Sequence, residues 1–144
     1  MRKSAGISIV FLCCATAMAA DFTGTWKLNP EKSKLRTPET LTITIEKTGP
    51  DSYRTSAKGT MSGKDFHFEV NRACDGREHA GAGESDKESE ICTIGAGRSR
   101  KIVMKDRGKV VRTVTSTVSK DSQTMTNLRV DNNGQDVMVF DREK

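Results

Sequence analysis

The sequence predicts an all-β protein, an antiparallel up-and-down β-barrel of about eight to nine short strands. Three observations lead to this fold class. Apolar and polar residues alternate over short segments between residues 22 and 140, which is the period of a half-buried strand. Residues that favour tight turns separate these segments. Along this part of the chain no stretch of ten residues combines helical periodicity with end caps. The pattern fits an up-and-down barrel or a sandwich, and the barrel is favoured because consecutive hairpins close on themselves without long crossovers.

The N-terminus has the pattern of a removable signal peptide. Met1-Arg2-Lys3 is a short basic start, and the apolar run at 5–17 is too short to span a bilayer as a helix. Ala17-Met18-Ala19 supplies the small residues at which signal peptidases cut. We therefore expect removal of residues 1–19, with a cut after Ala20 as the alternative, and a secreted or periplasmic protein.

Two other interpretations of this segment stay open. A lipoprotein would be cut before Cys13 or Cys14, although neither cysteine follows the small residue that such a cut usually needs. A buried N-terminal helix would carry its charge at one end and have no polar face. None of these interpretations includes a membrane span.

Composition limits what the remaining residues 20–144 can form. They are enough for one domain and too few for two. The net charge of the whole chain is +5. It falls to about +3 without Arg2 and Lys3, and a charge this small does not indicate a nucleic-acid partner. Hydrophobic residues make up 34% and aromatic residues 5%, so we expect a thin core. We also expect a monomer.

Four strands are predicted in the first half of the domain. Residues 22–28 alternate large and small side chains and end before Pro30, because proline cannot donate to a ladder. Residues 40–46 show the clearest period of two in the chain. Residues 52–60 and 65–70 lie on either side of a serine-glycine pair and are predicted to form a hairpin.

The strand pattern stops at 75–90, where glycines stand among acidic residues, and we expect a long acidic loop there. Beyond this loop, Asp106-Arg107-Gly108 is predicted to be a tight hairpin turn with the glycine at positive φ. The remaining strands are predicted at residues 91–94, 101–105, 110–118, 124–130 and 136–140.

A G-x-W motif, Gly24-Thr25-Trp26, stands on the first predicted strand. With its surroundings at 22–33, it resembles the lipocalins and the wider calycin group, and more closely the start of small exported bacterial lipocalin-like proteins. The resemblance implies a barrel that is closed at one end, open at the other, and able to hold a small apolar or amphipathic molecule. Further similar segments are residues 75–79, 108–111, 117–121 and 139–141.

The same resemblance implies roles for three residues. In lipocalins the G-x-W tryptophan lies at the closed end, and a basic side chain from the end of the last strand lies across its ring. Here Gly24 and Trp26 form the motif and Arg142 is the basic candidate. A guanidinium over an indole is favourable by roughly 0.5 to 2 kcal/mol. The alternative is that Arg142 belongs to a frayed polar tail.

Large side chains on the central strands are the candidate ligand contacts. The scarcity of aromatic residues favours a narrow cavity, or a barrel that is filled by its own side chains. The candidates are Tyr53, Phe66, Phe68 and Met104.

Cys74 and Cys92 are the only cysteines beyond the leader. In an oxidising compartment such a pair indicates a disulfide. Two unpaired thiols are the alternative, and a metal site is less favoured because neither cysteine has a second ligand at CxxC spacing. The two histidines, His67 and His79, are not expected to be catalytic, since His79 lies in the glycine-rich segment. We therefore predict no metal and no cofactor.

The leading functional hypothesis is an exported, non-enzymatic protein that binds a small hydrophobic or amphipathic ligand in its barrel. The sequence contains no G-x-S-x-G, H-E-x-x-H or phosphate-loop motif. The alternative is an interaction module with a filled barrel, whose basic hairpin meets an anionic surface or polymer. No aromatic residues interleave with these charges, so single-stranded nucleic acid is not expected. The hairpin charges are Arg98, Arg100, Lys101, Lys105, Arg107, Lys109 and Arg112.

Overall fold

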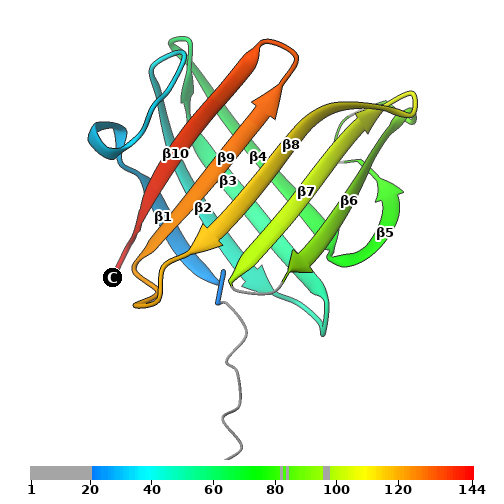
Figure 1. Cartoon of the computed structure of the whole chain (residues 1–144), viewed down its shortest axis with the longest axis horizontal. Coiled ribbons are helices and arrows are strands. Elements are labelled where there is room, and N and C mark those ends of the chain that lie inside the picture. The colour runs from blue at the N-terminus through cyan, green and yellow to red at the C-terminus, as the bar shows by residue number, and fades with distance from the viewer. Residues whose placement is uncertain (1–20, 82, 84, 96–97) are drawn as a thin grey trace, which may run out of the picture.

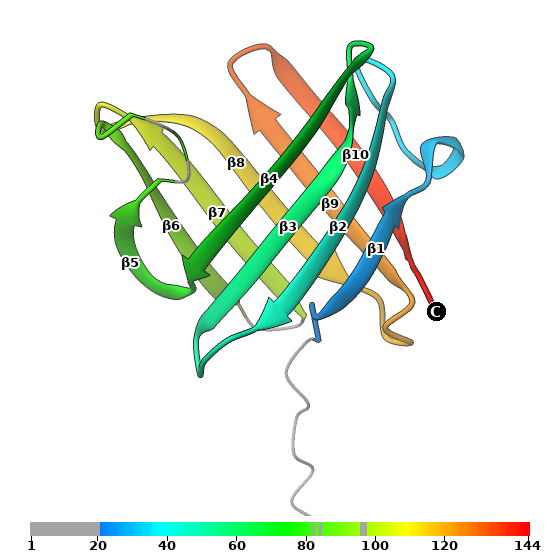
Figure 2. The same ribbon diagram turned by 180° about the vertical axis from the view of Figure 1, so that it is seen from behind.

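The structure, a computed structural model, describes residues 21–81, 83, 85–95 and 98–144. One antiparallel sheet of ten strands wraps into a near-closed barrel, which Figures 1 and 2 show from opposite sides. The strands are β1 (Gly24–Leu28), β2 (Glu39–Lys47), β3 (Ser52–Met61), β4 (Lys64–Ala73), β5 (Asp75–Ala80), β6 (Glu88–Gly95), β7 (Ser99–Asp106), β8 (Lys109–Val118), β9 (Thr124–Asp131) and β10 (Gly134–Arg142).

The sheet has the topology predicted from the sequence, an antiparallel up-and-down barrel. Its strand order is β4-β3-β2-β1-β10-β9-β8-β7-β6-β5, so consecutive strands pair throughout except β4 with β5, and β1 also pairs with β10. That last pairing joins the two ends of the chain, with Trp26 opposite Arg142. Strands β4 and β5 end the order, and we call the line between them the seam. The predicted fold class is confirmed, with ten strands in place of eight or nine.

The additional strand is β5, which lies within the segment predicted to be a loop. Its residues are exposed and show no alternation of apolar and polar types, so the sequence carries no signal for it. Backbone pairing with β6 holds it in place, and a register shift between Asp75 and Glu78 bends it. Gly76 has a φ of 78° at this shift. The bend is visible in Figure 2, where β5 curls beside the lower part of β6.

Two tight hairpin turns have the backbone that their sequences favour. Ser62 and Gly63 have φ values of 50° and 74°, and Arg107 and Gly108 have values of 49° and 79°. Positive φ at both central residues matches the twist of the flanking strands. Gly108 therefore has the conformation predicted for it, and both turns lie at one end of the barrel, which we call the open end.

The connection between β1 and β2 runs along the last strand. Asn29 caps a short 3-10 helix, η1 (Pro30–Lys32), by accepting hydrogen bonds from the backbone N–H groups of Glu31 and Lys32. Lys34 then exchanges two backbone hydrogen bonds with Val137 of β10, at 2.7 and 2.9 Å. This segment therefore extends the closure of β1 on β10.

The apolar core fills the end of the barrel at which β1 begins, which we call the closed end. Trp26 and Phe140 are fully buried there, and Phe22 and Met125 pack against them. A second, smaller cluster joins Ile102 to the two cysteines beside the seam. Since this end is filled, any interior space lies toward the open end.

The predicted signal peptide, residues 1–19, lies outside the described residues. Within the part of the chain that is described, no helix has the length and apolar character needed to cross a bilayer.

Candidate functional site

At the closed end, the guanidinium of Arg142 covers the ring of Trp26, with 4.1 Å between Cζ and the ring centroid. It also donates hydrogen bonds to the backbone carbonyls of Thr23 and Ser122, at 2.5 and 2.6 Å. Gly24 has a φ of +114°, and a Cβ at that position would clash with Nη1 of Arg142. The glycine of the G-x-W motif thus leaves room for the guanidinium that covers the tryptophan.

Beyond this filled end, a cavity of about 170 Å³ lies inside the barrel. It is close in size to cavities of about 150 Å³ that hold a benzene molecule, so it fits a small ligand. Apolar residues that line it are Leu41, Ile43, Ala57, Met61, Phe66, Phe68, Ile102, Met104, Val114 and Met138. Polar residues that line it are Glu39, Thr55, Arg72, Arg100, Arg112, Asn127 and Arg129.

Three of the four predicted ligand contacts line this cavity: Phe66, Phe68 and Met104. The rings of Phe66 and Phe68 are stacked on β4 with centroids 6.4 Å apart. Phe68 keeps 45% exposure because β4 borders the seam. Tyr53 is different, since it packs against both core clusters near the closed end. It is not among the described residues that line the cavity, and its role as a ligand contact stays a prediction.

A larger hollow, of about 580 Å³, lies along β1, β2 and β3. Much of its lining comes from outward-facing side chains such as Lys27, Thr40 and Lys58. Buried polar atoms without a partner occur in the interior cavity and are absent from the described lining of this outer hollow. We therefore take the interior cavity as the candidate site.

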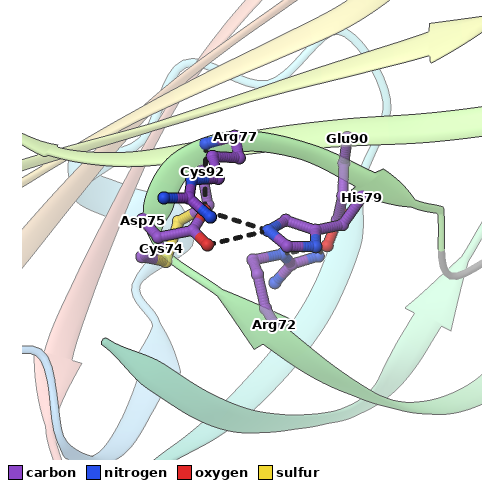
Figure 3. The surroundings of a disulfide bond; sticks show 7 residues. All are labelled: Arg72, Cys74, Asp75, Arg77, His79, Glu90 and Cys92. Atoms are coloured by element: carbon purple, nitrogen blue, oxygen red, sulfur yellow. Dashed lines mark hydrogen bonds and ion pairs between the residues drawn. A yellow bond between two sulfur atoms is a disulfide. The ribbon is translucent and has the colours of Figure 1, made fainter. Parts of the chain in front are cut away.

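Two bridges cross the seam beside the cavity, and Figure 3 shows both. Cys74 and Cys92 form the predicted disulfide, which links the end of β4 to β6. Nearby, the buried Arg72 on β4 donates two hydrogen bonds to Glu90 on β6, at 2.9 and 3.1 Å. These bridges hold together two strands that share no backbone ladder in the described sheet.

Near the open end, acidic side chains hold two further arginines. Arg129 pairs with Glu39 at 2.6 Å and with Asp136 at 3.0 Å. Arg36 pairs with Asp136 at 2.8 Å and with Asp131 at 2.9 Å. Hydrogen bonds from Arg36 hold the pKa of Asp136 far below its usual value and lower that of Asp131 to about 2. Both carboxylates are therefore charged at neutral pH and compensate the arginines beside them.

Arg100 on β7 is buried, with 5% exposure, and faces the cavity. Its Cζ lies 5.1 Å from the centroid of the Phe22 ring. Burial, and next the positive charge of Arg72, lower the pKa of Arg100 to about 10, so it is still protonated at neutral pH. Its Nε and Nη1 atoms have no hydrogen-bond partner in the described part of the protein.

The basic side chains of the hairpin at 98–112 were predicted to share one charged face, but they lie in different surroundings. Arg100 and Arg112 line the interior. Arg98 donates to the carbonyl of Ser119 at 3.0 Å, and Lys105 pairs with Glu78 at 3.1 Å. Because alternate side chains of a strand point to opposite faces, the charges that cluster in sequence do not form one surface.

Both histidines are exposed. Nε2 of His79 lies 2.9 and 3.1 Å from the two carboxylate oxygens of Asp75, as Figure 3 shows. The pKa of Asp75 is lowered, first by a hydrogen bond from the backbone N–H of Arg77 and then by His79. His67 lies on the outward face of β4. Among the described residues, no group of three or more His, Cys, Asp or Glu side chains is placed to hold a metal ion.

Comparison with family models gives no match, and comparison with curated proteins gives none. Solved structures with this fold include wild-type fluorescent protein UnaG, with a TM-score of 0.65 and 16% identity over 85% of this chain and 97% of that chain. Fatty-acid-binding protein 1 of Echinococcus granulosus gives 0.61 and 15%, over 85% and 98%. A Schistosoma mansoni fatty-acid-binding protein in complex with arachidonic acid gives 0.64 and 12%, over 85% and 96%.

At these identities the comparisons show a shared fold and nothing finer. The shared fold is a near-closed antiparallel β-barrel, and the barrel implied by the lipocalin resemblance of the sequence agrees with it at this coarse level.

The sequence interpretation missed the polar residues inside the barrel. Arg100, Ile102 and Met104 alternate along β7 and all face the cavity, so the period of two could have placed Arg100 inside. Arg72 follows the same period from Phe68 on β4. A charged side chain usually indicates the protein surface, and this rule hid the interior position of these two arginines. Arginines can be buried when they are paired or bind a ligand.

Proposed function

We propose that this chain is a non-enzymatic binding protein that holds one small amphipathic molecule inside its barrel. The observation that carries the proposal is the interior cavity, whose lining combines apolar side chains such as Phe66 and Met104 with buried polar groups such as Arg100 and Asn127. Ligand sites of proteins are typically apolar with a few placed polar groups that fix orientation.

Two further observations support this function. The barrel shares its fold with proteins that are named for binding fatty acids. The contact between Trp26 and Arg142 fits the closed end that the lipocalin resemblance implies.

The Cys74–Cys92 disulfide supports export, because disulfides persist in oxidising compartments. We accordingly propose a secreted or periplasmic monomer that is released from a signal peptide.

Native mass spectrometry of the protein purified from its own host tests the proposal. We expect a mass excess over the denatured chain that corresponds to one small organic molecule. A mass equal to that of the chain, together with no binding of small amphiphiles in titrations, would remove the proposed function.

A cavity-filling variant locates the ligand. Val114→Phe adds a ring to the lining of the cavity, and we expect it to abolish or strongly weaken retention of the molecule. Thr113→Phe is the matched control, because the neighbouring residue on β8 points to the outer face. If both variants retain the molecule equally well, it is bound outside the barrel.

A further inference from the structure

Three buried polar residues lie side by side on the interior face of the barrel. The register pairs Arg100 on β7 with Ser116 on β8, and Ser116 with Asn127 on β9. Their exposures are 5%, 0% and 6%. Within the described residues, Nε and Nη1 of Arg100, Oγ of Ser116 and Oδ1 of Asn127 all lack a hydrogen-bond partner. Buried polar groups are nearly always paired, so a row of unpaired groups beside a cavity points to an absent partner.

The other arginines that face the interior have protein partners. Arg72 is bound by both carboxylate oxygens of Glu90. Arg129 is held by two carboxylates, and Arg142 donates to backbone carbonyls. Arg112, which also lines the cavity, has a carboxylate oxygen of Asp131 at 4.0 Å. Arg100 differs from these in having neither a carboxylate nor a carbonyl on Nε and Nη1. The protein therefore satisfies its structural arginines itself and leaves this one open toward the cavity.

The missing partner carries negative charge. The charged groups that act on Arg100 include Arg72 and Glu90, and two cations beside one anion leave one positive charge uncompensated. A water molecule would satisfy the hydroxyl of Ser116, but it would not compensate a buried charge. The ring of Phe22 covers the guanidinium at 5.1 Å, and the cavity offers space for an anion to reach it.

We propose that Arg100, with Ser116 and Asn127, forms the receptor for a monoanionic head group, a carboxylate or sulfonate, of the small ligand. The inference rests on the proposed function and specifies its ligand class. The guanidinium binds two head-group oxygens through Nε and a terminal nitrogen, the geometry in which arginine pairs with planar anions. Ser116 donates its hydroxyl hydrogen, and Asn127 donates from its amide after rotation of the amide group. The apolar tail then lies toward Phe66 and Met104.

Three probes of equal length and different charge test the head-group site: hexanoate, hexan-1-ol and hexylammonium. Each is titrated into the full barrel domain and followed by NMR chemical-shift changes. We expect hexanoate to bind at least tenfold more tightly than hexan-1-ol, and hexylammonium to bind most weakly. Arg100→Met, which keeps the side-chain length without the charge, should bring hexanoate to the affinity of hexan-1-ol. Lys101→Met, on the outward face of the same strand, should leave all three affinities unchanged.

A stability measurement separates this role from a structural one. Arg100→Met removes an uncompensated buried charge, so its unfolding midpoint should equal or exceed that of the wild type. Ser116→Ala removes a hydroxyl that has no protein partner, so it should keep the midpoint and bind hexanoate about threefold more weakly. If Arg100→Met lowers the midpoint strongly, and Ser116→Ala binds hexanoate as the wild type does, the receptor assignment is wrong.

The probe series also separates failure of this inference from failure of the proposed function. Equal binding of hexanoate and hexan-1-ol to the wild type would overturn the head-group site and leave the apolar cavity as a binding site. A hexanoate preference that persists in Arg100→Met would place the anion elsewhere. Absence of binding by all three probes and by any host molecule would overturn both proposals.

Discussion

At the level of single residues, the closed end depends on one guanidinium that covers one indole. Arg142 combines that contact, at 4.1 Å, with hydrogen bonds to carbonyls that precede β1 and β9. Its side chain therefore reinforces the backbone pairing that joins the first strand to the last.

We expect Arg142→Ala to lower the free energy of unfolding by about 2 kcal/mol, because it removes a cation–π contact and leaves carbonyls unpaired. The emission of Trp26, the only tryptophan, should change as well. Arg142→Lys keeps the charge but not the planar donors, so an intermediate loss is expected. Denaturant unfolding and fluorescence measure both effects. Wild-type values for the alanine variant would show that the contact contributes nothing.

Gly24 is predicted to be irreplaceable for two separable reasons, its φ of +114° and its closeness to Arg142. Gly24→Ala should cost about 1 to 3 kcal/mol from backbone strain, with an added clash against the guanidinium. In a double-mutant cycle with Arg142→Ala, the cost of the alanine at residue 24 should shrink, because the clash is gone. Strictly additive losses in the free energy of unfolding would mean that backbone strain alone explains the effect of Gly24→Ala.

At the level of elements, the seam is the place where the barrel relies on side chains in place of a backbone ladder. The Cys74–Cys92 bond closes a loop with a sequence separation of 18 residues. In the chain-entropy model such a bond contributes about 3 kcal/mol. We expect the Arg72–Glu90 ion pair to remain when the disulfide is removed, so that β4 and β6 keep one of their two bridges.

The Cys74→Ala/Cys92→Ala variant should therefore fold, with a free energy of unfolding about 3 kcal/mol below that of the wild type. Hydrogen exchange should increase most in β4, β5 and β6, because these strands adjoin the seam. The reduced wild-type protein should match the variant in both measurements. Uniform exchange over all strands, or an unchanged stability, would show that the disulfide does not fasten the seam.

The elements also show what alternation can predict and what it cannot. Strands with one apolar face, such as β2, were predicted because burial selects every second residue. Strand β5 has six exposed residues and depends on the edge of β6, so its position follows from tertiary pairing and leaves no mark in its composition. Arg100 has the alternation of an inward residue, but its unpaired state depends on neighbours from β4, β6, β8 and β9 that only the fold brings together.

At the level of the whole molecule, a network of carboxylates and arginines joins the chain segments near the open end. Asp136 accepts from Arg36 and Arg129, and Glu39 accepts from Arg129. The network joins the β1–β2 connection to β2, β9 and β10, and its members are far apart in sequence. Removing one member leaves the partly exposed arginines or the buried carboxylates Asp136 and Glu39 without a partner, which is typically worse than replacing the whole network by apolar residues.

The network predicts how stability depends on pH. Hydrogen bonds from Arg36 depress the pKa of Asp136 and bring that of Asp131 to about 2. A carboxyl with a depressed pKa in the folded protein stabilises it above the unfolded-state value of about 3.9, and this contribution is lost as pH falls toward the folded-state value. The free energy of unfolding should thus be nearly constant from about pH 7 to 5 and should decline between about pH 4 and 2.

Asp136→Asn tests whether this network causes the decline. The variant should lose about 3 kcal/mol at neutral pH, because two arginines then face a neutral amide. It should also lose less than the wild type on going from about pH 4 to 2, since one titrating group is gone. Denaturant unfolding at several pH values measures both quantities. An equal acid-dependent loss in wild type and variant would assign the pH dependence to carboxylates elsewhere, such as Asp75 and Asp121, whose pKa values are also lowered.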